Sequence, residues 1–367
     1  MTTILFFSSY ASLTRGGQRS LWYILRDLDK RLYRPVLICQ EEGELTRRAS
    51  AELGVPFELL SVPLLRLSSV PAVLAFARRL WAIARKYGAR AVHSEELKVA
   101  LFLSPLRLAG FKVIWHVRVL WDMPVQKAIG VLVSNKVVCV SRAVAASFPA
   151  GFRKSLVVIR NGVDASEFSP LTGPPSIKKK GERLVGYFGG LLPHKGVEVL
   201  LRAFALVPKK ISGAGLLLAG GGDPEYIRKL RGLAVQLEIS GAVRFCGEVS
   251  DVRPLMGEAD IVAAPSLSGE GLSRSILESM AMGKPIVASS LPQNAELIKD
   301  GETGLLSAIG DHEELAAKIL ALLENGDLSG RLGRGARAYV EANHSLPSVI
   351  SSVHELYAEL FGRGGRE

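Results

Sequence analysis

Short apolar runs alternate with amphipathic stretches along most of the chain. In Gln18–Leu28, three leucines and an isoleucine recur at helical spacing, which predicts a helix with one buried face. The apolar runs Ile4–Ser8 and Pro35–Cys39 predict strands. Strands that alternate with helices predict an α/β fold, with a parallel sheet covered by helices on both faces.

The same alternation continues through the chain with one interruption. Segment Phe168–Lys180 holds three prolines, a glycine and a charge run, which is typical of a linker or exposed loop. Because 367 residues exceed one typical core, we expect two domains, 1–168 and 169–345. Further helices are expected at 44–53, 71–87, 197–206 and 224–237, and strands at 91–93, 113–116, 137–140, 184–188, 215–219, 243–246, 261–264 and 286–288.

A separate helix is predicted within the C-terminal segment 346–367. Its apolar residues follow helical spacing, so the helix must bury that face against another part of the molecule. These residues are Leu346, Val349, Ile350, Val353, Leu356, Tyr357, Leu360 and Phe361.

Composition narrows the class of protein. No uncharged apolar run approaches the roughly 18–20 residues that span a bilayer, and Ile4–Phe7 is interpreted as a first strand, not a signal peptide. The 3 cysteines form no CxxC motif and the 6 histidines show no ligand spacing, which argues against structural zinc. This cysteine usage is compatible with a reducing cytoplasm, where we expect the protein to act.

Positive charge is concentrated in the N-terminal half. Residues 1–172 hold 24 Lys and Arg against 12 Asp and Glu, whereas residues 173–367 hold 22 against 23. One interpretation is a solvated basic surface; the other is attraction to an anionic membrane leaflet or an anionic acceptor. The second is favoured by Leu64–Arg90, where Arg66, Arg78, Arg79, Arg85, Lys86 and Arg90 are mixed with apolar residues and Trp81. No nucleic-acid partner is expected.

Segment Pro265–Ala288 carries the candidate chemistry. Its pattern predicts strand, loop, helix, turn and strand, with Ser273 as the N-cap of the helix. The unpaired N–H groups at the start of such a helix suit a diphosphate, and Gly271 allows the backbone to come close. Glu278, inside the helix, could accept hydrogen bonds from a ribose diol, and Glu270, ahead of the helix, could face a hexose. The alternative is a buried helix with two solvated glutamates.

In order and spacing, the chain resembles family 4 of the retaining glycosyltransferases, which have the GT-B fold. The resemblance implies two Rossmann-like domains that face each other across a cleft, with the last helix returning to the N-terminal domain. The N-terminal domain would take the acceptor and the C-terminal domain the nucleotide sugar. The matching pieces are Arg15-Gly16-Gly17, His116, Val140-Ser141, Arg160–Asp164, Gly189–Gly196, Val243-Arg244-Phe245 with Gly247, the pair Glu270 and Glu278, Gly283-Lys284-Pro285, and Asp300–Leu306.

The resemblance also implies roles for individual residues. Glu270 is similar to the residue that hydrogen-bonds the donor sugar, and Glu278 to the glutamate that binds the ribose. Lys195 is similar to the lysine that neutralises the leaving diphosphate. His116 matches a histidine that faces the donor sugar, although a histidine at the end of a strand can also be structural. The expected donor-binding set is completed by Gly16 and Gly17 in the first loop and by Gly190, Gly271, Leu272, Ser273 and Arg274.

The chain departs from the family at Gly190. The family usually has an arginine there, and that arginine contacts the diphosphate together with the lysine five residues later. Because negative charge builds on the departing phosphate, loss of a cation should reduce catalysis. Arg274 is the nearest replacement in sequence, unless it faces solvent.

The predicted function is retaining transfer of a hexose from a nucleotide-diphosphate sugar to a glycan or lipid-linked acceptor. No DxD-like motif ends a strand, so neither a metal ion nor any cofactor besides the donor is expected. Two alternatives remain: a sugar-nucleotide epimerase of related fold, and a non-catalytic sugar-nucleotide-binding protein, which Gly190 favours. A nicotinamide dehydrogenase is disfavoured because no GxGxxG follows the first strand. The sequence identifies neither base, sugar nor acceptor.

Overall fold

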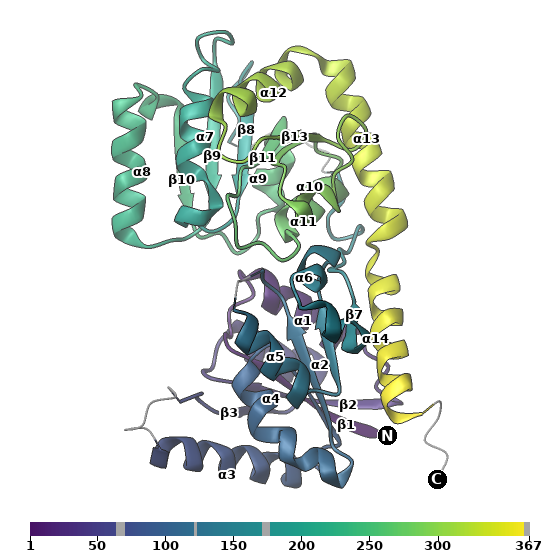
Figure 1. Ribbon diagram of the computed structural model, residues 1–367. Coiled ribbons are helices and arrows are strands. Elements are labelled where there is room, and N and C mark those ends of the chain that lie inside the picture. The colour runs from purple at the N-terminus through teal and green to yellow at the C-terminus, as the bar shows by residue number, and fades with distance from the viewer. Residues whose placement is uncertain (64–69, 121–122, 171–176, 363–367) are drawn as a thin grey trace. The chain divides into compact units, whose positions relative to one another are not determined.

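The computed structural model describes residues 1–63, 70–120, 123–170 and 177–362 (Figure 1). Parts of two segments singled out in the sequence lie outside these residues: 171–176 of the expected linker, and Leu64 and Arg66 of the basic stretch. The chain divides into two compact units. Unit 1 comprises Met1–Asn161 and Pro347–Glu367, and unit 2 comprises Gly162–Leu346.

Unit 1 is built on a seven-stranded sheet in which every pair of neighbours is parallel. The strand order is β3-β2-β1-β4-β5-β6-β7, so the order reverses between β1 and β4. Parallel strands buried on both faces need near-continuous apolar sequence, as β1 has in Ile4–Phe7. The strands are β1 Thr2–Ser8, β2 Tyr33–Cys39, β3 Phe57–Leu59, β4 Ala91–Ser94, β5 Lys112–Val117, β6 Lys136–Cys139 and β7 Leu156–Val158.

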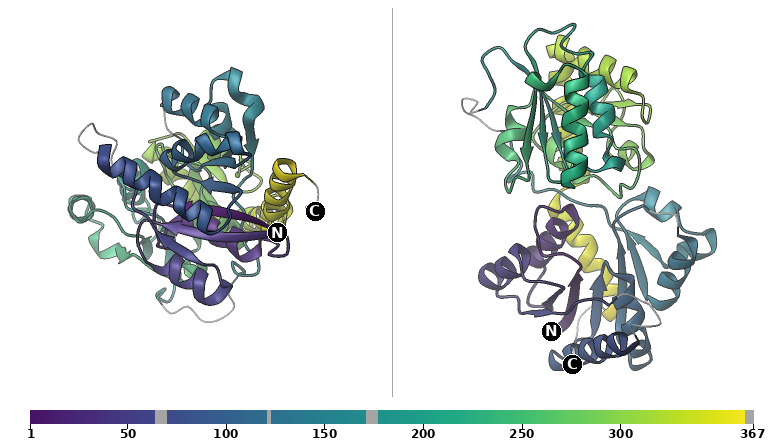
Figure 2. Two further views of the ribbon diagram at one scale, coloured as in Figure 1. Left: turned by 90° about the horizontal axis from the view of Figure 1, so that it is seen from below. Right: turned by 90° about the vertical axis from the view of Figure 1, so that its left-hand side faces the viewer.

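Helices cover both faces of the unit 1 sheet (Figure 2). The C-terminal helix α14 belongs to this unit and buries Ile350, Val353, Leu356 and Tyr357. It therefore hides the apolar face that the sequence required it to bury. The helices of unit 1 are α1 Gly16–Asp27, α2 Glu44–Leu53, α3 Val70–Lys86, α4 Leu97–Leu103, α5 Pro124–Val133, α6 Arg142–Ala146 and α14 Leu346–Phe361, with 3-10 turns η2 Ser104–Ala109 and η3 Ala150–Ser155.

Unit 2 has a six-stranded sheet, again parallel throughout, in the order β10-β9-β8-β11-β12-β13. Here the order reverses between β8 and β11. Alternate strand residues such as Val185, Leu216 and Ile261 form one core with α7, α8 and α12, while α10 packs against α13. The strands are β8 Arg183–Phe188, β9 Ala214–Ala219, β10 Val243–Gly247, β11 Ile261–Ala264, β12 Ile286–Ser289 and β13 Leu305–Ser307.

The helices of unit 2 follow the strands in the expected alternation. They are α7 Val197–Phe204, α8 Pro224–Gln236, α9 Arg253–Glu258, α10 Arg274–Ala281, α11 Pro292–Ala295, α12 His312–Glu324 and α13 Gly326–Asn343, with 3-10 turns η4 Pro193–Lys195 and η5 Ser240–Ala242. The predicted α/β class with two Rossmann-like parallel sheets is confirmed. No helix in the described part of the chain is long and apolar enough to cross a membrane.

Candidate donor and catalytic site

In unit 2, the expected donor residues lie at the point where the strand order reverses. Gly189 and Gly190 directly follow β8, and Pro265–Glu270 follow the neighbouring strand β11. Connections leave such a pair of strands toward opposite faces of the sheet, so a crevice forms beyond their carboxyl ends. The sheet topology therefore places these two loops where open α/β folds bind ligands.

Lys195 and Glu270 are in direct contact at this position. Lys195 Nζ lies 2.5 Å from Glu270 Oε1, and Ser266 Oγ donates to the same oxygen at 2.7 Å. The side chain of Lys195 is 24% exposed and that of Glu270 is 11% exposed. The ammonium has three donors and only one contacts Glu270, so it can still donate to an anion in the crevice.

The turn that carries Lys195 is fixed against the Glu270 loop by backbone contacts. Leu267 N donates to His194 O at 2.7 Å. Gly196 has a φ of +70°, and a Cβ there would lie 2.0 Å from Pro265 O. Only glycine allows this approach, and the approach sets the distance between the two charged side chains.

Helix α10 begins as the sequence predicted. Ser273 is its N-cap, with Oγ accepting from Ile276 N. Gly271 and Leu272, in the loop ahead of the helix, are buried. The first turn therefore presents N–H groups beside Glu270, which suits an anion.

Glu278 and Arg274 form a buried ion pair within α10. Arg274 Nη2 lies 2.9 Å from Glu278 Oε1, and both side chains are less than 10% exposed. Arg274 Nη1 also donates to Gly162 O at 3.1 Å. Arg274 therefore does not face solvent, and its charge is already balanced by Glu278. This makes it a poor replacement for the cation missing at Gly190.

The backbone at Gly190 could accept a side chain. The nearest atom to a Cβ built there is Leu192 Cδ1 at 3.4 Å, an ordinary contact distance. Gly190 O accepts a hydrogen bond from the Tyr187 hydroxyl at 2.8 Å. Burial, and then the charge of Glu270, raise the pKa of Tyr187, which therefore stays a donor. Sterics do not explain why the arginine is absent.

In unit 1, Gly16 and Gly17 begin α1 beside a polar cluster that the sequence did not reveal. Arg118 Nε lies 3.3 Å from Glu95 Oε2, and Gln18 Nε2 donates to Glu95 Oε1 at 2.8 Å. A Cβ at Gly17 would lie 3.2 Å from Arg118 Cδ. Glu95 follows β4 and Arg118 follows β5, so strand adjacency brings them together next to the reversal at β1. Only correct strand pairing could have predicted this cluster.

His116 lies near the end of β5 and is 4% exposed. Its Nδ1 lies 2.9 Å from His93 Nε2, and His93 Nδ1 lies 2.7 Å from the Tyr357 hydroxyl. Among the described residues, His116 Nε2 has no hydrogen-bond partner. Burial, assisted by Arg118, lowers the pKa of His93 to about 3 and that of His116 well below its usual value, so both rings are neutral at neutral pH.

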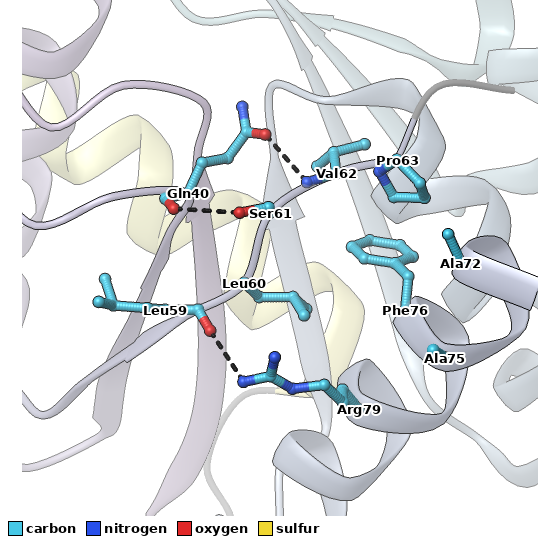
Figure 3. Close-up of a pocket in the computed structure, with 10 residues that line it drawn as sticks. All are labelled: Gln40, Leu59, Leu60, Ser61, Val62, Pro63, Ala72, Ala75, Phe76 and Arg79. Carbon is cyan, nitrogen blue, oxygen red and sulfur yellow. Dashed lines mark hydrogen bonds between the residues drawn. The ribbon is translucent and has the colours of Figure 1, made fainter. Parts of the chain in front are cut away.

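A cavity of about 530 Å³ lies at the carboxyl ends of β2 and β3 (Figure 3). Its wall is largely apolar, with Leu60, Val62 and Phe76. Gln40 Oε1 accepts from Val62 N at 2.9 Å, and Arg79 donates to Leu59 O at 3.3 Å. None of the donor or catalytic residues expected from the sequence lines this cavity.

Comparison with known proteins adds to these observations. The family model described as Glycosyltransferase Family 4 matches residues 14–167, and that described as Glycosyl transferases group 1 matches residues 182–325. Together the two models cover most of the chain, which therefore belongs to the glycosyltransferases of family 4 and group 1. The two matches include the strand-order reversal of unit 2 with its Lys195–Glu270 contact, and His116 in unit 1.

Two curated relatives of this family 4 chain are named as mannosyltransferases. It is 32% identical over 212 residues to the phosphatidyl-myo-inositol mannosyltransferase of Mycolicibacterium smegmatis, covering 57% of the chain and 53% of that relative. It is 32% identical over 218 residues to a lipopolysaccharide core biosynthesis mannosyltransferase of Rhizobium leguminosarum, covering 56% of the chain and 60% of that relative. The matches thus span only about half of the relatives' length.

The Anabaena protein HepE, solved in complex with UDP and glucose, superimposes with a TM-score of 0.82 at 21% identity, covering 98% of this chain and 100% of HepE. The predicted GT-B class is confirmed. Within the described residues of this family 4 chain, no three His, Cys, Asp or Glu side chains are placed to hold a metal ion. The expectation that catalysis needs no metal stays a prediction.

Proposed function

We propose that the chain is a metal-independent, retaining hexosyltransferase. It moves a sugar from a nucleoside diphosphate to a glycan or lipid-linked acceptor. The observation that carries the proposal is the contact between Lys195 and Glu270 at the strand-order reversal of unit 2, directly ahead of the α10 N-terminus. A cation, a carboxylate and the N-terminal end of a helix at one point suit a diphosphate joined to a polyhydroxyl group.

In this proposal each group has a distinct task. Lys195 and the first turn of α10 bind the diphosphate, Glu270 accepts hydrogen bonds from sugar hydroxyls, and Glu278 accepts them from the ribose. The bond between the anomeric carbon and the phosphate oxygen breaks while the acceptor oxygen bonds to the same face of that carbon. The acceptor proton passes to the departing phosphate. The protein supplies orientation and charge stabilisation, with no covalent nucleophile.

The relatives' names suggest the first substrates to test. Two curated relatives are called mannosyltransferases, which favours a mannosyl donor, and the HepE complex contains UDP. Their names also refer to phosphatidyl-myo-inositol and to lipopolysaccharide core, which favours a lipid-linked acceptor. We propose accordingly that the protein works at the cytoplasmic face of a membrane, on which its basic unit 1 docks.

The test is turnover of GDP- and UDP-linked hexoses by the purified chain, with and without a lipid-linked acceptor. We expect release of the nucleoside diphosphate, an unchanged anomeric configuration in the product, and equal rates in EDTA. Lys195→Met should lower kcat more than donor affinity, because the charge that Lys195 neutralises grows toward the transition state.

Other outcomes point to the alternatives. A converted sugar that stays on its nucleotide would indicate an epimerase. Donor binding without any turnover would indicate a binding protein. Loss of activity in EDTA that Mg²⁺ restores would contradict metal independence.

A further inference from the structure

A buried chain of three hydrogen-bonding side chains connects the C-terminal helix to the candidate site in unit 1. Tyr357 on α14 contacts His93 on β4, and His93 contacts His116 on β5, at 2.7 and 2.9 Å. The three side chains are 0%, 5% and 4% exposed. Phe6 and His116 stack on His93 at ring distances of 5.6 and 5.0 Å, which holds its imidazole in place.

The direction of these hydrogen bonds follows from which nitrogen of each imidazole carries a proton. Both imidazoles are neutral, so each has one N–H and one bare nitrogen. Within the described residues, the Tyr357 hydroxyl has no acceptor other than His93 Nδ1, and a buried hydroxyl that donates to nothing is costly. Tyr357 therefore donates to Nδ1 of His93, whose proton lies on Nε2. That proton is donated to Nδ1 of His116, so the proton of His116 lies on its Nε2.

We propose that Tyr357, acting through His93, holds His116 in the tautomer whose Nε2–H donates a hydrogen bond to an oxygen of the donor sugar. His116 Nε2 is buried and lacks a partner among the described residues, as expected of a hydrogen-bond donor whose acceptor is a bound ligand. The opposite order of protons would present a bare nitrogen, which can accept a hydrogen bond from a hydroxyl but cannot donate one to any sugar oxygen. Tyr357 and His93 are thus positioning residues. The role given to the sugar rests on the proposed function.

Long-range proton–nitrogen NMR spectra of the full chain at pH 7.5 report each tautomer directly. The chain has only 6 histidines, and His93→Asn and His116→Asn would assign the two signals. We expect the proton on Nε2 in both rings. A proton on Nδ1 of either ring would overturn the proposal. This measurement requires no activity, so it is decided independently of the proposed function.

Tyr357→Phe removes only the hydroxyl and makes both proton orders accessible. The population of His116 Nε2–H should fall, and kcat/KM should fall by the same factor. Tyr33→Phe is the matched control, because the Tyr33 ring is 5.1 Å from that of Tyr357 but is not part of the relay formed by Tyr357, His93 and His116. It should change neither quantity. An unchanged tautomer in Tyr357→Phe, or a lost tautomer with unchanged kcat/KM, would overturn the proposal.

A third measurement connects the tautomer to the ligand. Saturating UDP-glucose or GDP-mannose should shift the His116 Nε2 proton resonance in the native chain and less so in Tyr357→Phe. If a nucleotide sugar binds without shifting this resonance, His116 does not contact the sugar. If neither nucleotide sugar binds, the proposed function fails and the link from His116 to a sugar fails with it, whereas the tautomer assignment stands on the spectra.

Discussion

At the scale of single residues, the structure changes what a substitution at Glu278 should do. The carboxylate does not stand alone in α10, because Arg274 is bonded to it and is itself buried. Glu278→Ala would remove the carboxylate partner of a buried guanidinium, and breaking a buried ion pair typically costs about 3–5 kcal/mol of stability. A test of ribose binding therefore needs a substitution that keeps an oxygen able to accept a hydrogen bond from Arg274.

Glu278→Gln is that substitution. Hydrogen bonds to a charged acceptor exceed those to a neutral one by about 1–1.5 kcal/mol, so donor affinity should fall roughly tenfold. Calorimetric titration with the nucleoside diphosphate would measure it. Glu225→Gln, at an exposed position on α8, serves as control and should bind normally. Equal affinities would remove Glu278 from the ribose site.

Gly190→Arg tests whether the site lacks a cation. The backbone there can carry a side chain, and the replacement Arg274 is already neutralised by Glu278. A partly exposed added charge contributes about 0.2–1 kcal/mol, so kcat/KM should rise by up to about fivefold. Gly190→Ala controls for the loss of glycine and should leave kcat/KM unchanged. No gain with arginine would mean that another group already supplies the charge.

At the scale of elements, a helix that buries its apolar residues could be predicted from the sequence. A helix that exposes apolar residues and buries a charged one could not. Helix α2 was predicted with the bounds that it has, because its burial follows its apolar spacing. Helix α5 was missed: Lys127 on it is buried, with Nζ bonded to Ser147 O, while Val125 and Leu132 are exposed. Strands as short as β3 carry too few residues to show a pattern.

The tight fit between the Lys195 turn and the loop that follows β11 gives a prediction at this scale. Gly196→Ala should destabilise unit 2 by about 1–3 kcal/mol from its positive φ alone, and further because its Cβ would overlap Pro265 O. Gly213→Ala is the matched control, since its φ is +76° but a Cβ there has no neighbour within 4 Å. Chemical denaturation should show the larger loss for Gly196→Ala, together with weaker donor binding. Equal losses would mean that the turn shifts freely.

At the scale of the whole molecule, helix α10 with Glu278 inside it and Glu270 ahead of it, and the alternation of strands and helices, could be predicted because they are local in sequence. Contacts between distant segments could not. The relay from Tyr357 to His93 joins residues whose sequence separation is 264, and the Glu95–Arg118 pair depends on β4 lying beside β5. Sequence periodicity predicts which face is buried, but not which side chain it meets.

The buried histidines make stability depend on pH. Their pKa values are lowered in the folded chain, to about 3 for His93, by burial and by Arg118, whereas unfolded histidine titrates near 6.5. The unfolded chain therefore binds more protons below pH 6.5, and stability falls as the pH drops from there toward 3. Between pH 7.5 and 5.5 each histidine should contribute a loss of about 1.4 kcal/mol. Denaturant midpoints at both pH values would measure this loss of stability. The double variant His93→Gln with His116→Gln should remove most of the difference between the two midpoints.

The last prediction concerns the basic surface of unit 1. Helix α3 buries Phe76, Leu80 and Ile83, so part of its apolar sequence belongs to the core. Its opposite face, however, exposes Leu74 and Trp81, at 57% and 38%. Arg78 and Arg85 are exposed on the same helical stripe, at spacings of four, three and four residues. Apolar groups interleaved with cations suit the headgroup boundary of an anionic bilayer.

Charge reversal on this stripe tests the docking. Each cation near an anionic surface contributes about 1 kcal/mol, so Arg78→Glu with Arg85→Glu should weaken vesicle binding by roughly 30-fold or more. Lys209→Glu with Lys210→Glu, exposed positions in unit 2, changes net charge equally and should leave binding nearly intact. Co-sedimentation should require anionic lipid and weaken as salt rises, because exposed charges are screened. Equal recovery with neutral vesicles, or equal losses in both double variants, would rule out docking through α3 and favour an anionic soluble acceptor instead.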